Sequence, residues 1–444
     1  MSHWPAAYGD IAVRRRFSID NTARRGQDGV MSETSFWHPQ GPMATAKNDE
    51  IIFVRGEGSH LWTDDGRKMF DAGASLWYAN IGHGDQRITE AVRRQMAQLE
   101  GFHSFGNFAT PITKKLTDKI VEIAPLGPDA KVFLGSGGSD AIDTAAKLAR
   151  RYFTATGEPN RRILISREHA YHGLHGFGTA LGWMPAMRAG YGDLDPDILR
   201  ASATDVDDVE KVIMNAGPEL VAAFFCEPVI GAGGAIFPGE DYLHRVRELC
   251  RRHGILFVAD EVITGFGRTG EWFASERWDL QPDMITFAKG VTSGYLPVGG
   301  VVISPKVCRP FWEDGSTELF KHGLTYSGHA TCAAAGVANI EVIESDGLLE
   351  RVRHLEPLMA DGLRSLSDHP AVAEVRAGAG LIGSVLTHDA DASERFYQAM
   401  LNEGVVSRKI GADGRGMQFS PPFVMTDDEL DWLVGATRRA LDQV

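Results

Sequence analysis

Short apolar runs alternate with longer amphipathic segments between about residues 130 and 305, and this alternation is the feature that most limits the fold. Apolar runs that read as strands occupy residues 131–134, 162–165, 220–226, 255–259 and 284–288. Amphipathic stretches at 139–153 and 242–253 predict helices among them. The runs are apolar on both faces, as parallel strands covered by helices are. The order therefore predicts an α/β domain with a mostly parallel sheet.

The pattern changes after about residue 336. Residues 381–386 and 417–419 read as short strands beside amphipathic helices. The last helix opens with a capping box between Thr426 and Glu429. A chain of 444 residues is too long for one small core, so we expect a second, smaller α+β domain here.

Charge and composition exclude several classes of protein. The formal charge is −14, from 59 acidic against 45 basic residues, which argues against a nucleic-acid binder or a protein of anionic membrane surfaces. No apolar run reaches the roughly 18 residues of a membrane-spanning helix. The segment Arg14–Phe17 resembles a twin-arginine signal, but no apolar region follows it, so export is not expected.

The four cysteines, Cys226, Cys250, Cys308 and Cys332, form no CxxC pair. Their spacing predicts neither a zinc site nor a disulfide framework, and the chain has no HExxH motif, so we expect no metal. A reducing cytoplasm is the expected compartment.

A glycine-rich turn follows the first strand, with the sequence GSGGSD at residues 135–140. It begins as G-x-G, but Asp140 stands where a dinucleotide fingerprint has its third glycine, so that motif fails. Flexible amides, a helix N-terminus and the hydroxyl of Ser139 still make a general phosphate cradle. A plain tight turn is the alternative.

Two charged residues end buried strands. Asp260 closes the run 255–259, where an unpaired acid is costly, so it serves as a helix cap or ion pair, or as the partner of a cationic heterocycle. Lys289 closes the run 284–288 and either extends to solvent or is desolvated, with a lowered pKa and an amine free to attack a carbonyl. Together with the cradle, these are the ingredients of a pyridoxal 5′-phosphate (PLP) site.

The stretch DEVITGFGRTG at 260–270, followed by FAKG at 287–290, resembles the signature of the class III aminotransferases, which are PLP enzymes of fold type I. The similarity runs from about Gly41 to the C-terminus and includes the segments AYHG at 170–173, EP at 227–228 and LTYSGH at 324–329. The resemblance implies a large domain with a seven-stranded sheet and a small α+β domain built from both chain ends. The expected segments are a polar extension at 1–30, small-domain residues 31–79, the large domain 80–335 and small-domain residues 336–444.

The resemblance also implies roles for the residues around the cofactor. Lys289 is similar to the lysine that holds PLP as a Schiff base and moves the proton between the substrate Cα and the cofactor C4′. Asp260 is similar to the partner of the pyridinium nitrogen. Val262 and Tyr171 are similar to the residues on the two ring faces, and Glu227 to a buried glutamate near Asp260.

Phosphate-binding positions are implied in the same way. Gly138 and Ser139 match them, whereas Gly137 lacks the hydroxyl that relatives have at this place, so backbone amides must contribute more. Thr325 resembles a threonine that reaches the phosphate of the neighbouring subunit, which implies an obligate homodimer and leaves a tetramer open.

Within the class, the chain is most similar to (S)-selective ω-amine:pyruvate transaminases. The segment 71–77 resembles their pocket, with Trp77 lining the substrate site. The segment 404–408, ahead of 420–422, resembles the one whose mobile arginine binds the keto-acid carboxylate. Arg408 takes that place here, and Arg415 competes for it.

The expected reaction is a ping-pong transamination from a primary amine or ω-amino acid to a keto acid, with pyruvate as the expected acceptor. The alternatives of the same fold are a 2-oxoglutarate-dependent ω-aminotransferase of the 4-aminobutyrate or ornithine type, an aminomutase and a decarboxylase. A non-catalytic protein of this fold and a nucleotide-dependent α/β enzyme are more distant hypotheses; intact Lys289 and Asp260 disfavour the first, and the broken glycine motif disfavours the second. The amine donor stays open.

Overall fold

The structure is a computed structural model, and it describes residues 34–444. The predicted extension 1–30, including Arg14–Phe17, lies outside the described residues. Residues through Ile52 form one unit and Phe53–Val444 another. The described part of the first unit contains the short helix α1 (Met43–Ala46) and a 2.8 Å contact between His38 Nε2 and Glu50 Oε1. The second unit carries all the predicted site residues.

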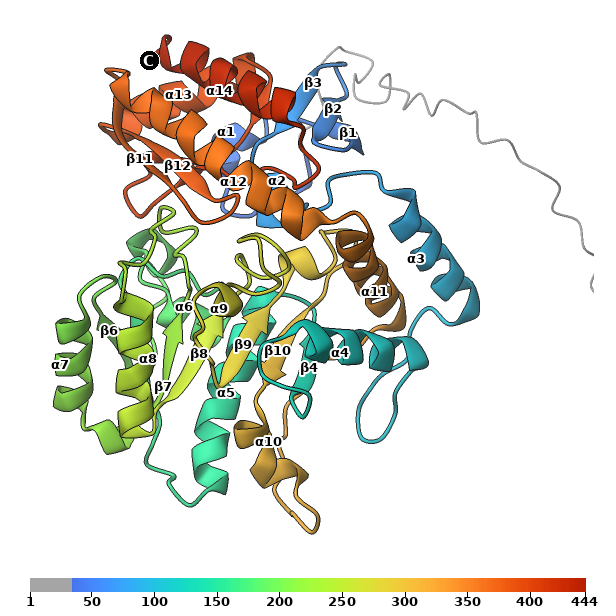
Figure 1. The fold of residues 1–444 in the computed structure, drawn as a ribbon, viewed down its shortest axis with the longest axis vertical. Coiled ribbons are helices and arrows are strands. Elements are labelled where there is room, and N and C mark those ends of the chain that lie inside the picture. The colour runs from blue at the N-terminus through green and yellow to red at the C-terminus, as the bar shows by residue number, and fades with distance from the viewer. Residues whose placement is uncertain (1–33) are drawn as a thin grey trace, which may run out of the picture. The chain divides into compact units, whose positions relative to one another are not determined.

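A seven-stranded sheet forms the centre of the second unit (Figure 1). Its strands are β4 (Lys131–Gly135), β5 (Ile163–Arg167), β6 (Ile198–Ala201), β7 (Val221–Cys226), β8 (Leu256–Asp260), β9 (Met284–Phe287) and β10 (Gly299–Ile303). Their order is β4-β10-β9-β8-β7-β5-β6, and only β10 runs antiparallel to its neighbours. The predicted α/β class with a mostly parallel sheet is confirmed.

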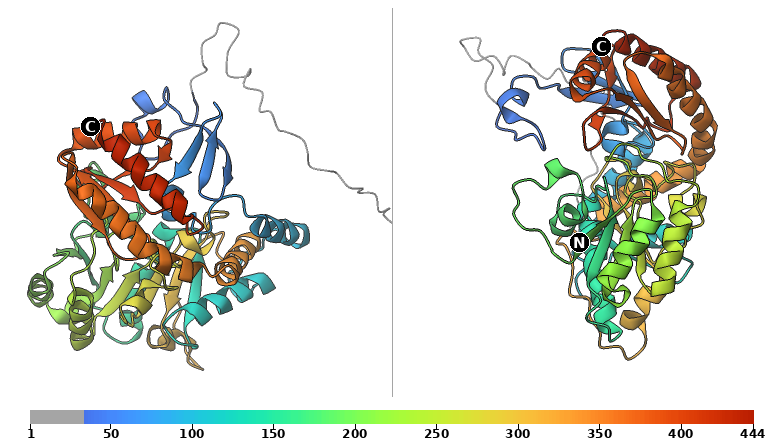
Figure 2. Two further views of the ribbon diagram at one scale, coloured as in Figure 1. Left: turned by 45° about the horizontal axis from the view of Figure 1, so that its top comes forward. Right: turned by 90° about the vertical axis from the view of Figure 1, so that its left-hand side faces the viewer.

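Helices cover both faces of this sheet (Figures 1 and 2). One layer contains α5 (Gly138–Ala155), α6 (Gly176–Leu181) and α10 (Pro305–Trp312), and the other contains α4 (Pro111–Ile123), α7 (Val206–Ala216) and α8 (Tyr242–His253). Alternate residues of β8 point to the two layers. Leu256 and Val258 pack against the layer of α5, and Phe257 and Ala259 pack against the layer of α8. Each fully buried large apolar side chain contributes about 1.5–3 kcal/mol to stability.

The antiparallel strand β10 lies against the glycine turn that precedes α5. An ideal Cβ on Gly299 would lie 2.4 Å from the carbonyl oxygen of Gly137, closer than a side chain can approach. Glycine is therefore required at 299 for β10 to pair with β4 beside this turn. The close packing fixes the start of α5 relative to the sheet.

Two further sheets come from the chain's outer segments. One contains β1 (Phe53–Glu57), β2 (His60–Thr63), β3 (Lys68–Asp71) and β13 (Val405–Val406), and the other contains β11 (Val372–Ala377), β12 (Gly383–Thr387), β15 (Gly416–Phe419) and β14 (Lys409–Ile410). Because β13 pairs with β3, with Val405 opposite Phe70, the two ends of the unit share one sheet, as expected. The exact boundaries after residues 30, 79 and 335 stay predictions.

The remaining helices pack on these sheets or join them to the large one. They are α2 (Ala74–Trp77), α3 (Gln86–Gln98), α9 (Ala274–Arg277), α11 (Ala330–Ser345), α12 (Leu348–Arg364), α13 (Ala390–Asn402) and α14 (Asp427–Leu441). Short 3₁₀ turns are η2 (Pro185–Met187), η3 (Pro218–Leu220), η4 (Lys289–Val291) and η5 (Ser365–Asp368). The predicted capping box is present: the Thr426 hydroxyl accepts from the Glu429 amide at 3.2 Å, and Glu429 Oε2 accepts from the Thr426 amide at 2.8 Å.

None of the helices within residues 34–444 combines the length and the apolar character that crossing a membrane requires.

Candidate active site

The carboxyl ends of five strands carry most of the predicted site residues. Asp260 is the last residue of β8, Lys289 and Glu227 come just after β9 and β7, and the glycine turn and Tyr171 follow β4 and β5. These five strands run in the same direction, since β4 and β9 are both antiparallel to β10. The side chains therefore meet at one edge of the sheet, where ligands of open α/β sheets bind.

The carboxylate of Asp260 is almost fully buried and receives three hydrogen bonds. Oδ1 accepts from the backbone amide of Val262 and from the hydroxyl of Thr286, each at 3.1 Å. Oδ2 lies 2.6 Å from Nδ1 of His172. At this distance a carboxylate accepts from the Nδ1–H tautomer of the histidine ring. The three donors offset the desolvation of a buried charge and fix the direction of the carboxylate.

Glu227 is buried close to this group. Its Oε1 accepts from the backbone amide of Tyr171 and its Oε2 from that of Gly231, each at 3.0 Å. Burial raises the pKa of Glu227; the nearby His172 opposes the shift, and the charge of Asp260 adds to it. The carboxyl group thus ties the loop after β5 to the loop after β7.

The amine of Lys289 lies within electrostatic reach of both acids. Burial lowers the pKa of Lys289 to about 8, although the charges of Asp260 and Glu227 favour the protonated form; Arg408 and Arg268 disfavour it. Its backbone has a φ of 48°, an uncommon value for a residue with a side chain. Such conformations persist where the surrounding structure holds them. A lowered pKa suits an amine that attacks a carbonyl, and the role of Lys289 in the reaction stays a prediction.

The turn before α5 has the geometry of an anion site. The first helical hydrogen bond runs from the Ala141 amide to the Gly137 carbonyl, so the amides of Gly138 and Ser139 have no acceptor within the helix. A Cβ on Gly137 would meet nothing within 4 Å, whereas one on Gly138 would lie 2.9 Å from Val262. The predicted phosphate positions and the predicted ring neighbour Val262 are thus adjacent.

Trp77 and Arg408 come from the outer segments. Trp77 is buried, and it clusters with Ile263 next to Val262 and with Ile410 on β14. Burial lowers the pKa of Arg408. The guanidinium of Arg408 makes no hydrogen bond or ion pair with any residue of 34–444.

Arg415 and Thr325 lie apart from this group. Arg415 is ion-paired through Nε with Asp413 Oδ2 at 2.7 Å. Thr325 is exposed in a turn, and no hydrogen bond joins it to the other site residues within the described chain. A role for Thr325 in the site of its own chain is not supported by this geometry, which leaves the implied role in a neighbouring subunit.

Three buried residues of the site carry no role that the sequence predicted. His172 is hydrogen-bonded to Asp260, and its Nε2 has no protein partner within the described residues. Thr286 contacts the same carboxylate. Arg268 donates to the carbonyls of Ser420 and Pro421 and to Asn80 Oδ1, and burial lowers its pKa to about 9. The only available signals were the position of His172 beside Tyr171 and that of Arg268 inside the 260–270 motif.

Known proteins share this arrangement. The family model of "Aminotransferase class-III" matches residues 43–441. The chain belongs to the class III aminotransferases. It is 35% identical to the putrescine–pyruvate aminotransferase of Pseudomonas aeruginosa over 88% of this chain and 90% of that one. It is 31% identical to the mitochondrial gamma aminobutyrate transaminase 1 of Solanum lycopersicum, over 95% and 86%. An amine transaminase from an uncultivated Pseudomonas species, solved in its PLP-bound form, superposes with a TM-score of 0.88 at 32% identity, over 93% and 99%.

This aminotransferase uses PLP, as its family does, and the residues present fit the cofactor. The free amides at the start of α5 suit a phosphate, and the open space beside Gly137 admits it. The oriented carboxylate of Asp260 suits a protonated ring nitrogen. The lowered pKa of Lys289 suits an amine that bonds to a carbonyl carbon. Within residues 34–444, no His, Cys, Asp and Glu cluster is arranged to hold a metal ion.

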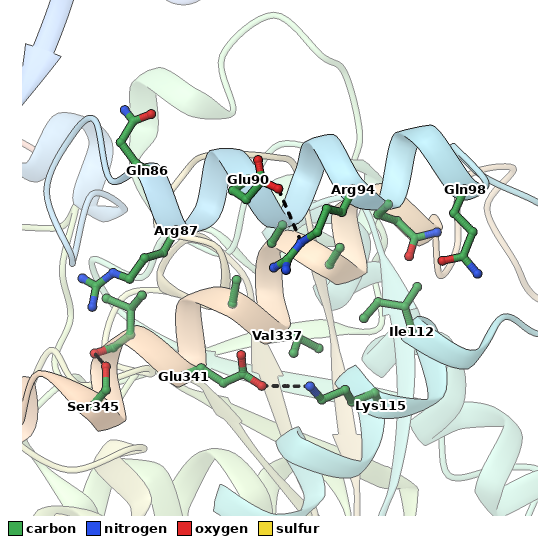
Figure 3. A pocket seen from close by; sticks show the side chains of 15 residues that line it. Gln86, Arg87, Glu90, Arg94, Gln98, Ile112, Lys115, Val337, Glu341 and Ser345 are labelled. Atoms are coloured by element: carbon green, nitrogen blue, oxygen red, sulfur yellow. Dashed lines mark hydrogen bonds and ion pairs between the residues drawn. The ribbon is translucent and has the colours of Figure 1, made fainter. Parts of the chain in front are cut away.

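The aminotransferase also has a groove that lies away from these residues. The groove of about 750 Å³ runs between α3, α4 and α11 (Figure 3). Its charged side chains pair with one another: Lys115 Nζ lies 2.8 Å from Glu341 Oε1, and Arg94 lies 3.8 Å from Glu90. None of the predicted site residues lines it, so the groove is separate from the candidate active site.

The pKa of Lys289 predicts how fast the cofactor-free protein takes up PLP at different pH values. Only the neutral amine attacks a carbonyl, so the rate should rise with pH until about 8 and then level off. An ordinary lysine would keep gaining rate up to its usual pKa of 10.5. The measurement is the growth of the visible band after mixing with PLP at fixed ionic strength. A rate that still climbs tenfold per pH unit well above 8 contradicts the burial of the amine.

Proposed function

We propose that this aminotransferase moves the amino group of a primary amine or ω-amino acid to pyruvate, and that Lys289, Asp260 and Arg408 are its principal residues. The observation that carries the proposal is the electrostatic group around Lys289. A desolvated amine faces two buried carboxylates and a guanidinium without a protein partner. The group therefore combines an amine that can act as a base, a carboxylate that can hold a cationic ring and a guanidinium that can bind a carboxylate.

Lys289 and Asp260 divide the proton chemistry between them. Bound PLP supplies a conjugated ring that accepts the electron pair left when the substrate Cα loses its proton. The neutral amine of Lys289 takes that proton and returns it at C4′, a task that its pKa near neutrality suits. The carboxylate of Asp260, oriented by the three donors described above, is the proposed partner of the protonated ring nitrogen. The carboxylate of Asp260 is buried and so shielded from water.

Arg408 is the proposed receptor for the keto-acid carboxylate. Its half-buried guanidinium lacks a hydrogen-bond acceptor in the described chain, and a carboxylate offers two in the matching bidentate geometry. Arg415, the competing residue, is already neutralised by Asp413 at 2.7 Å. An amine without a carboxylate would instead contact the apolar cluster of Trp77 and Ile410.

The number of available cations favours pyruvate over 2-oxoglutarate. A second carboxylate needs a second cation, but Arg268 is committed to the carbonyls of Ser420 and Pro421, and Arg415 to Asp413. Of the two relatives named above, the one named for pyruvate is also the more similar. Each active site thus has one free guanidinium, that of Arg408 among the described residues, for one substrate carboxylate.

We also propose a homodimer in which Thr325 serves the partner's cofactor. Phe102, Phe105 and Phe108 are each about half exposed, an unusual concentration of aromatic surface that a second copy would cover. The same loop is tied to the turn that carries Thr325, since the Ser104 hydroxyl donates to the Ser327 carbonyl at 2.7 Å. Covering the aromatic loop would thus bring Thr325 to the interface.

A cytoplasmic location is proposed with this activity. Cys226, Cys250 and Cys308 are buried free thiols, which a reducing compartment preserves.

The proposed reaction is tested by the visible absorbance of the PLP-loaded protein. Adding α-methylbenzylamine should bleach the band of the lysine-bound cofactor, and pyruvate, but not 2-oxoglutarate, should restore it. Lys289→Ala should lack the band, while a control variant of an exposed lysine, Lys321→Ala, should keep it. A band that persists in Lys289→Ala overturns the assignment of the lysine. If 2-oxoglutarate restores the band and pyruvate does not, the acceptor is 2-oxoglutarate.

Replacing Arg408 by Met should weaken keto-acid use without weakening the amine half-reaction. Loss of charge-assisted hydrogen bonds worth about 1.5–3 kcal/mol predicts a fall of roughly 10- to 150-fold in kcat/KM for pyruvate. Arg415→Met is the matched control and should change this value little, because Arg415 is paired with Asp413. Stopped-flow measurement of each half-reaction separates the two. If Arg415→Met lowers kcat/KM for pyruvate and Arg408→Met does not, Arg415 is the receptor for the carboxylate.

The dimer is tested by light scattering of the loaded protein. Wild type should have twice the chain mass of 48.4 kDa, and Phe105→Asp should shift toward the monomer because it places a charge on the covered surface. Tyr191→Asp, which alters an exposed aromatic residue of another loop, should stay dimeric. A monomeric wild type that holds PLP and turns over would refute the proposed role of Thr325.

A further inference from the structure

The turn that leads to Trp77 has a strained backbone. After β3, residues Ala74, Ser75 and Trp77 have φ angles of 44°, 54° and 68°. Ser75 combines its φ of 54° with a ψ of −102°, a region that turns normally give to glycine. Strained conformations of residues with side chains persist only where neighbouring groups hold them. Three such residues within four positions therefore require a specific restraint.

The restraint is the carboxylate of Asp71, the last residue of β3, which is fully buried. Its Oδ1 accepts from the amide of Gly73 at 3.2 Å, and its Oδ2 accepts from the amide of Ser75 at 2.7 Å. His83 Nε2 lies 2.8 Å from the same Oδ2 and holds the carboxylate in place. These bonds are made to the strained backbone itself, so they fix the turn directly.

A second set of bonds holds the turn from the other side. The side chains of Gln418, on β15, and Ser420 each donate to the carbonyl of Gly73 at 3.1 Å. The peptide at Gly73 is thus fixed by Asp71 through its amide and by the C-terminal segment through its carbonyl. The turn has no freedom to relax while both sets of bonds remain.

The turn determines where the indole of Trp77 lies. This side chain is 2% exposed and clusters with Val229, Ile263 and Ile410. In the chain, Val229 lies two residues after Glu227 and Ile263 lies one residue after Val262. Ile410 lies two residues after Arg408. The indole is therefore packed against the segments that carry the candidate site, and a shift of the turn would move one of its walls.

We propose that Asp71 is a positioning residue that determines amine selectivity, because it holds the strained turn 73–77 and thereby the indole of Trp77. The proposal rests on the proposed function and adds a control of substrate size to it. Asp71 touches no reacting atom and acts only through the backbone of the turn. Without its charge, Ser75 relaxes, the indole leaves its place, and the contact of Trp77 with an aryl group is lost.

The test compares two amine donors, α-methylbenzylamine and sec-butylamine, with the PLP-loaded protein. In Asp71→Asn, the ratio of kcat/KM for the aryl amine to that for the alkyl amine should fall about tenfold, the size of one lost aromatic contact. The change should appear in the KM of the aryl amine, with little change in kcat and with the visible band retained. Asp65→Asn, which removes an exposed carboxylate near the same sheet, is the control and should leave the ratio unchanged.

Rescue distinguishes positioning from a general effect on stability. Glycine adopts the backbone angles of Ser75 without strain, so Ser75→Gly in the Asp71→Asn background should restore most of the ratio. Ser75→Ala, which keeps the strain, should not. If Asp71→Asn does not fold, Gln418→Met removes the second restraint and should lower the ratio in the same direction.

The possible failures are separable. If the wild-type protein shows no visible band and no transamination, the proposed function fails. If wild type transaminates and Asp71→Asn lowers kcat/KM for both amines equally, together with the unfolding temperature, then Asp71 only stabilises the fold and the positioning role is overturned.

Discussion

A buried negative charge at the carboxyl end of β8 is the constraint on which the site depends. Asp260 is tolerated there because a histidine, a hydroxyl and a backbone amide all donate to it. Its charge and that of Glu227 favour the protonated form of Lys289 and so oppose the lowering of the lysine pKa by burial. The pair therefore forms one electrostatic unit.

A buried positive charge, the guanidinium of Arg268, joins segments that are distant in the chain. Arg268 is fully buried and, in place of a carboxylate, binds the carbonyls of Ser420 and Pro421 and the side chain of Asn80. It joins the loop after β8 to both outer parts of the unit. Pairing of β13 with β3 brings the same parts together, so the segments of Arg408 and Trp77 reach the sheet edge as neighbours. The proposed substrate residues therefore depend on the pairing of the outer segments, whereas the proposed cofactor residues lie at the ends of the strands of the large sheet.

The elements that could be predicted are those with a strong local signal. Strand β8 and helix α8 were predicted almost to the residue, because an apolar run and an amphipathic period are both properties of neighbouring residues. Strands β6 and β10 were not predicted. The antiparallel direction of β10 depends on which strands it pairs with, and its first glycine, Gly299, reflects packing against the turn at Gly137. The polar partner of Asp260 was missed for the same reason, since His172 is far from it in the chain.

The sequence by itself determined the α/β class and the family, and it supplied the prediction that Lys289 and Asp260 carry the chemistry, since these follow from the order of apolar runs and from short motifs at strand ends. Only the tertiary structure decided that Arg408 lacks a protein partner while Arg415 has one, that Arg268 is committed to carbonyls, and that Asp71 holds a strained turn beneath Trp77. The physical reason is that hydrogen bonding and desolvation depend on which distant groups meet, and a linear pattern does not contain those distances.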